Sequence, residues 1–87
     1  MGKVNSQRQY QKSPSITVEQ FVLLLIIMEN GQKGRTREEI RQRAEEEGIY
    51  FSDFKVSMHL RRLEVLGVLR SVVCQSTERW YSMLEVA

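Results

Sequence analysis

Residues 52–73 read S-D-F-K-V-S-M-H-L-R-R-L-E-V-L-G-V-L-R-S-V-V, and they decide the fold expected for the chain. At the helical step of about 100° per residue, residues 53–66 form one apolar stripe made of Val56, Leu60 and Leu63. The edge of this stripe carries His59 and Leu66. The other side carries Ser57, Met58, Arg61, Arg62 and Val65. Gly67 follows the last turn, and a β-branched run begins after it. The stretch therefore predicts a helix with one buried face, a sharp end and a strand directly after it.

Two capping boxes predict the helices that precede this stretch. Thr17 and Thr36 each stand three residues ahead of a Gln or Glu, the spacing at which side chain and backbone cap each other. The first helix is expected from Thr17 to near Asn30, and the second from Thr36 to Gly48, with Ile40 and Ala44 as its few buried residues. The short connection between the second and third helices predicts a helix-turn-helix.

The first helix is apolar over most of its length. Its expected inward face consists of Val18, Phe21, Val22, Leu24, Leu25 and Met28. Leu23 and Ile27 are left on the outer side, one turn apart, among polar residues. Two stacked apolar side chains on a polar face suggest self-association, so both are the candidate dimer interface. Additional packing in the core is the open alternative.

The C-terminal part predicts a β-hairpin with strands at residues 68–74 and 79–86. Residues 75–78 contain no glycine, so a loop of about four residues is expected instead of a two-residue primed turn. Trp80 is the largest side chain available to pack the hairpin on the helices. The fold class is thus a mainly helical α+β domain over residues 15–87, preceded by a flexible basic arm at residues 1–14.

Residues 56–70, V-S-M-H-L-R-R-L-E-V-L-G-V-L-R, resemble the recognition helix and first wing strand of small bacterial and archaeal winged-helix repressors. The pattern V-S-x-H-L-x-x-L-x-x-x-G-x-[LIV] recurs there, and the matching residues are Val56, Ser57, His59, Leu60, Leu63, Gly67 and Leu69. Residues 79–81, R-W-Y, resemble the R-x-Y that often opens the second wing strand. The resemblance covers residues 16–84. It implies a winged helix ordered helix, short strand near Arg35, helix, helix, strand, wing, strand, and a transcriptional regulator that binds double-stranded DNA.

Within this frame the helix at residues 53–66 is expected in the major groove. Arg61 and Arg62 are about 100° apart around the helix, so one can reach a base edge while the other meets a phosphate. Ser57 and Met58 belong to the half that normally enters deepest, and Lys55 to its side can meet the backbone. The alternative for the arginines is a solvated helix face with Glu64 as partner.

Further DNA contacts are expected from the wing and from the start of the second helix. The wing residues are Gln75, Ser76, Thr77 and Arg79, which suit a phosphate backbone or a minor groove. Thr36 and Arg37 begin a helix whose free N–H groups favour a phosphate. A plain exposed turn and simple helix capping are the respective alternatives, and capping and phosphate binding can coexist at Thr36.

The sequence gives little support for catalysis, metal binding or disulfide formation. The single histidine, His59, is expected to pack beside the core; a base, a metal ligand or a pH switch are the alternatives. The single cysteine, Cys74, is expected to be a buried or idle thiol, with an intermolecular disulfide as the alternative. No metal, cofactor or small-molecule substrate is expected. No nucleophile and base set is visible, so the chain is not expected to be an enzyme.

The distribution of charge along the chain says more about function than the overall composition does. A net charge of +2 over 87 residues would not by itself suggest nucleic acid. However, residues 1–15 carry Lys3, Arg8 and Lys12 and no acid, whereas residues 37–47 are net acidic. The longest apolar run, residues 21–28, is too short to span a bilayer, and the N-terminus is no secretory signal. A cytoplasmic or otherwise intracellular protein is expected, nucleoid-associated or in a host cell if viral.

Three functions stay in competition. The first is a DNA-binding regulator, expected to act as a homodimer. The second is a winged-helix module that docks on another protein, suggested by the acidic second helix and by exposed apolar residues, namely Met58, Val65, Leu23 and Ile27. The third is a binder of single-stranded nucleic acid that stacks bases on Tyr10, Trp80 and Tyr81.

Overall fold

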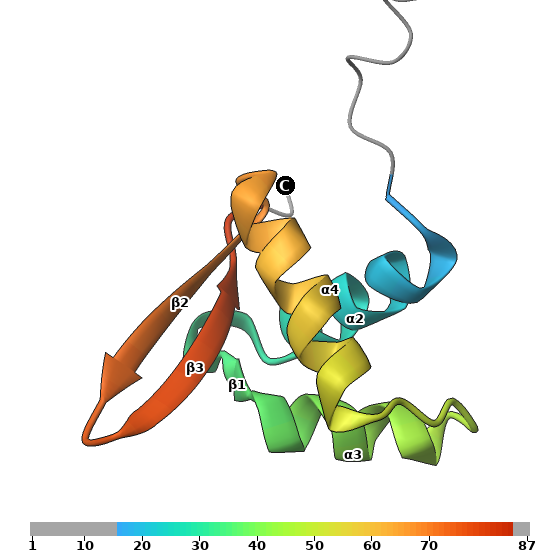
Figure 1. Ribbon diagram of the computed structural model, residues 1–87. Coiled ribbons are helices and arrows are strands. Elements are labelled where there is room, and N and C mark those ends of the chain that lie inside the picture. Colours follow the sequence, from blue (N-terminus) through green and yellow to red (C-terminus); the bar gives the residue numbers. More distant parts are fainter. Residues whose placement is uncertain (1–15, 85–87) are drawn as a thin grey trace, which may run out of the picture.

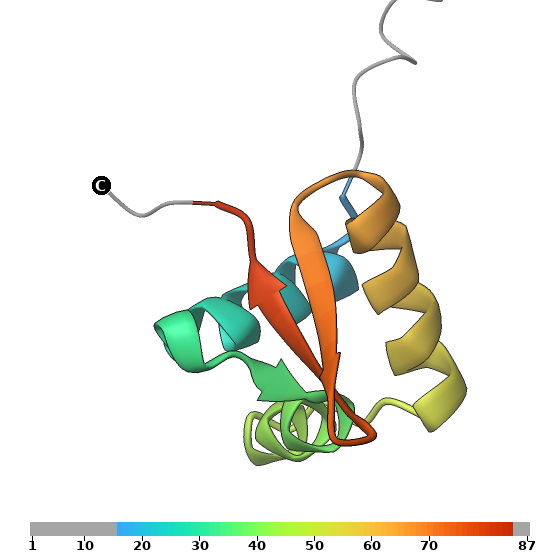
Figure 2. The same ribbon diagram turned by 90° about the vertical axis from the view of Figure 1, so that its left-hand side faces the viewer.

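The computed structural model describes residues 16–84 (Figures 1 and 2). In chain order its elements are α2 (Val18–Glu29), the 3-10 turn η1 (Gly31–Lys33), β1 (Arg35–Thr36), α3 (Arg37–Glu46), α4 (Asp53–Val65), β2 (Leu69–Cys74) and β3 (Thr77–Ser82). The described part is therefore an α+β domain with three α-helices and a three-stranded antiparallel sheet. The predicted order of elements is confirmed. The expected N-terminal arm, with Tyr10, lies outside the described residues.

The sheet has the order β1-β3-β2, so β3 is its central strand. Arg35 and Thr36 of β1 pair with Trp80 and Arg79 of β3, while β2 pairs with β3 along its whole length. Figure 2 shows α4 on the β2 side of the sheet, and the hairpin turn at the same end of the domain as α3. This arrangement carries the Trp80 side chain into the core, where it is 2% exposed.

Local signals explain where the helices begin and end. The side chains of Thr17, Thr36 and Ser52 each accept a hydrogen bond from a backbone N–H in the first turn. Both predicted capping boxes are present. Gly48 and Gly67 adopt φ of 84° and 85° just past α3 and α4. The next N–H in each case bonds a carbonyl five residues back, the Schellman arrangement.

The predicted orientation of α2 is wrong. Leu23 and Ile27 are fully buried, whereas Val18, Phe21 and Leu25 are 78%, 52% and 45% exposed. The predicted dimer interface at Leu23 and Ile27 is therefore wrong as well, because both side chains are already packed inside the same chain. The helix is apolar at almost every position, so its apolar residues do not mark one face.

The buried face of α2 is marked by a polar residue. Gln20 is 3% exposed, and its Nε2 lies 3.2 Å from Nδ1 of His59 on α4. Its Oε1 accepts the backbone N–H of Thr17 at 3.2 Å, so Nε2 is the donor toward the histidine. His59 is 8% exposed and meets Phe51 edge-on at 6.1 Å between ring centroids. This placement fits the packing interpretation of His59.

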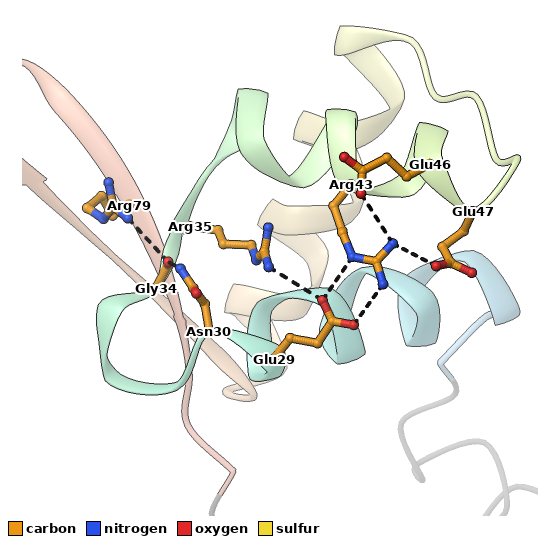
Figure 3. A network of polar contacts seen from close by, with 8 residues as sticks. All are labelled: Glu29, Asn30, Gly34, Arg35, Arg43, Glu46, Glu47 and Arg79. Atoms are coloured by element: carbon orange, nitrogen blue, oxygen red, sulfur yellow. Dashed lines mark hydrogen bonds and ion pairs between the residues drawn. The ribbon is translucent and has the colours of Figure 1, made fainter.

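A polar network joins the end of α2 to α3 and β1 (Figure 3). Glu29 accepts two bonds from Arg43, both 3.2 Å, and one from Arg35 at 3.4 Å. Hydrogen bonds to Glu47 and then to Glu29 raise the pKa of Arg43 above its ordinary value. Beside this network, Asn30 Nδ2 donates to the carbonyl of Gly34 at 2.6 Å. The segment leading into β1 is thus held by side chains from α2.

The hairpin turn differs from the prediction. Cys74 pairs with Thr77, so only Gln75 and Ser76 form the turn, with φ of 53° and 67°. Positive φ at both central residues is the requirement of a type I′ turn, which matches the twist of the strands. The absence of glycine raises the strain of this turn but does not prevent it.

Replacing Gln75 and Ser76 together by Asn-Gly should stabilise the domain. These residues adopt positive φ at lower cost, so the free energy of unfolding should rise by about 1 kcal/mol. Thermal unfolding followed by circular dichroism should show a melting temperature about 4–8 °C higher. Ser76→Ala is the control, because alanine keeps the strain and should give no increase. An equal increase in both variants would contradict this explanation.

Candidate nucleic-acid interface

A hollow of about 350 Å³ lies between the start of α3, the Ser57, Leu60 and Arg61 side of α4, and the hairpin turn. Six of the residues predicted to contact DNA line it: Thr36, Arg37, Ser57, Arg61, Ser76 and Thr77. The other lining residues include Leu60 and Trp80, and two acids, Glu38 and Glu78. Three elements that are distant in sequence thus contribute to one surface, which carries charges of both signs.

Arg37 connects α3 with α4. Its Nη1 donates to Ser57 Oγ at 3.0 Å, and no ion pair to Arg37 occurs among residues 16–84. Thr36 next to it caps α3, because its Oγ1 accepts the N–H of Glu39 at 3.1 Å. The capping alternative for Thr36 is therefore realised, and Arg37 supplies the cationic group at this end of the hollow.

The side chain of Arg61 is 56% exposed, and the alternative with Glu64 as its partner is realised. Its Nη1 donates to Glu64 and its Nη2 to Glu78 on β3, both at 3.2 Å. Its guanidinium carbon lies 4.9 Å from the ring centroid of Trp80. Hydrogen bonds to Glu64 and then to Glu78 raise the pKa of Arg61 above its ordinary value. The charge of Arg61 is thus shared with two acids, and the side chain is turned across α4 toward the hairpin.

Arg62 is exposed on α4, and it forms no ion pair with any residue of the described part. Lys55 is exposed as well, and Met58 is half-buried. Phe54 and Val65 are 75% and 85% exposed. The outer side of α4 is consequently a mixed surface of cations and apolar groups. Sequence reasoning did not single out Phe54, although its position four residues before Met58 places both on the same face.

Arg79 lies away from the hollow. Its Nε donates to the carbonyl of Lys33 at 3.0 Å and its Nη2 to that of Gly34 at 3.2 Å, the latter contact being drawn in Figure 3. Arg79 therefore does not join the predicted wing residues Ser76 and Thr77 in the hollow. Its guanidinium holds the segment before β1, because β1 pairs with β3 directly after that segment.

The remaining predicted positions lie at the hairpin end. Gln75, Ser76 and Thr77 are exposed. The Cys74 thiol beside them is free and exposed, so of the expected buried or idle thiol the burial is wrong. Within residues 16–84, no three His, Cys, Asp or Glu side chains gather in a way that could hold a metal ion. No helix in the same range combines the length and apolar character that a membrane crossing requires.

Comparison with known proteins adds no relative: no protein-family model matches the chain, and no curated protein or solved structure is significantly similar to it.

Proposed function

We propose that this chain is a winged-helix domain that binds double-stranded DNA and regulates transcription. In this proposal α4 enters the major groove, the β2–β3 turn is the wing, and the start of α3 meets the phosphate backbone. The observation that carries it is the hollow, because the start of α3, one side of α4 with Ser57 and Arg61, and the turn all line it. The order of elements and the helix-turn-helix formed by α3 and α4 support the same assignment.

The proposed DNA surface consists of the hollow and of the exposed side of α4 next to it. Arg37 in the hollow and Lys55 and Arg62 on α4 are the cations that can neutralise phosphates, because none of them is paired with an acid in residues 16–84. Ser57 and Met58 lie along the same helix and are the candidates for base contacts. A homodimer on a two-fold site remains part of the proposal, with its interface elsewhere than Leu23 and Ile27.

Replacing Arg37 and Arg62 together by alanine should weaken binding to duplex DNA. Each neutralised phosphate contributes about one unit to the slope of log affinity against log salt. The double variant should therefore lose about two units of slope and roughly 10- to 100-fold in affinity at low salt. Filter binding over a salt titration measures both quantities.

Lys33→Ala is the control for this experiment. It removes one positive charge where the double variant removes two, and Lys33 in η1 lies neither in the hollow nor on α4. This variant should keep the affinity of the wild type within about twofold. Unchanged binding in the Arg37 and Arg62 variant, or an equal loss in the control, would count against this surface as the DNA site.

A protein-docking module is the second candidate, and one observation favours it. Tyr50, Phe54 and Val65 are all at least 75% exposed on or next to α4. Large exposed apolar groups are typical of protein interfaces. A lack of salt-sensitive retention on DNA columns, together with a stoichiometric protein complex that Phe54→Ala disrupts, would favour this function over DNA binding.

A further inference from the structure

Arg61, Glu64, Glu78 and Trp80 form a cluster that joins α4 to the hairpin beside the hollow. We propose that Glu64 and Glu78 hold Arg61 in an internal ion cluster that restrains the affinity of this surface for DNA, and that Arg61 exchanges Glu78 for a phosphate when DNA binds. This inference concerns regulation of the same site and rests on the proposed function.

Glu78 lies where it would compete with a DNA phosphate for the Arg61 guanidinium. Its carboxylate Oε1 lies 3.2 Å from Arg61 Nη2, at the distance of a charge-assisted hydrogen bond. Both residues line the hollow, so the acid occupies the place where a phosphate oxygen would meet the guanidinium. A phosphate that approaches Arg61 must therefore displace an acid of the same chain.

The cluster can open at low cost. The side chains of Arg61, Glu64 and Glu78 are 56%, 36% and 31% exposed. Exposed ion pairs of this kind are weak, because water screens the charges and two long side chains lose freedom. The contact to Trp80 at 4.9 Å restricts the position of the guanidinium without opposing its charge. Arg61 can thus change partners while α4 and the hairpin stay in place.

The acids that line the hollow do not have the same role. Glu38 lines it too, but it pairs with Arg41 on the same helix, and hydrogen bonding to Arg41 lowers the pKa of Glu38. No ion pair joins Glu38 to Arg61 in the described residues. Glu38→Gln therefore removes the same charge from the same hollow as Glu78→Gln while leaving the Arg61 cluster intact.

The test compares Glu78→Gln with Glu38→Gln in two backgrounds, wild type and Arg61→Ala. Filter binding to a duplex of random sequence at low salt measures the affinity. In the wild-type background Glu78→Gln should raise affinity about tenfold, because it frees Arg61 and removes a repulsive charge. Glu38→Gln should raise affinity only about two- to threefold, the effect of charge alone. In the Arg61→Ala background Glu78→Gln should raise the affinity no more than Glu38→Gln does, since Arg61 is no longer present to be released.

The outcomes separate this inference from the proposed function. If the wild type shows no salt-dependent binding to duplex DNA, both are overturned. If the wild type binds, but Glu78→Gln gives equal gains in the two backgrounds or no more than Glu38→Gln, only the cluster's restraining role is overturned. Glu64→Gln serves as second variant should Glu78→Gln fail to fold by circular dichroism, and it should show the same dependence on Arg61.

Discussion

Replacing Gly34 with alanine should destabilise the domain strongly. Gly34 has φ 65° and ψ −172°, a region that essentially only glycine adopts. An added Cβ would also lie 2.7 Å from the carbonyl oxygen of Trp80 and 2.7 Å from the ring of Tyr81. The Trp80 oxygen belongs to the central strand and cannot move aside cheaply. We expect a loss of at least about 3 kcal/mol of the 5–15 kcal/mol typical of a small domain.

Gly31→Ala is the matched control for Gly34→Ala. Gly31 also has positive φ, at 56°, but nothing lies within 4 Å of an added Cβ. The Gly31→Ala variant should therefore lose only about 1 kcal/mol of unfolding free energy, the cost of the backbone conformation alone. Urea denaturation of both variants gives the two losses. Equal losses would contradict the close approach between Gly34 and β3.

Replacing Leu23 with alanine should destabilise the domain by about 3 kcal/mol, within the range of 2–5 kcal/mol found for buried leucines. Leu23 is fully buried at the centre of the core, so truncation leaves a cavity that the neighbouring helices cannot fill. Leu25→Ala two residues later should cost less than about 0.5–1 kcal/mol, because that side chain is 45% exposed.

The measurement for Leu23→Ala and Leu25→Ala is the urea midpoint at constant slope, which reports stability alone. Both variants are compared at two protein concentrations, because linked self-association would shift the midpoint with concentration. A larger loss for Leu25→Ala than for Leu23→Ala would restore the orientation of α2 that the sequence alone suggested.

The parts of the fold that local sequence determines were predictable. Thr17 with Gln20 and Thr36 with Glu39 define helix starts through contacts three residues apart. Gly67 defines a helix end through its own positive φ. In α4, polar and apolar positions alternate clearly enough for its buried stripe to follow from periodicity.

The sequence did not predict the orientation of side chains whose partner is distant along the chain. Gln20 marks the buried face of α2 only because His59 meets it across 39 residues of chain. Arg61 turns toward the hairpin because Glu78 on β3 lies next to it. The guanidinium of Arg79 is directed away from the turn because it donates hydrogen bonds to the carbonyls of Lys33 and Gly34. Local spacing contains none of these partners. The three predicted elements do line one hollow, whereas Arg61 and Arg79 each have partners within the chain that local spacing does not reveal.

The burial of Trp80 has a practical consequence. It is the only tryptophan of the chain, it is 2% exposed, and it lines the hollow beneath the Arg61 guanidinium. Excitation that is selective for tryptophan over the three tyrosines therefore reports on one side chain, which borders both the hydrophobic interior and the candidate binding surface. Unfolding should shift its emission to longer wavelength, while a change at Arg61 should alter its intensity at constant wavelength. Unlabelled protein can in this way report loss of structure and rearrangement of the surface as separate optical signals.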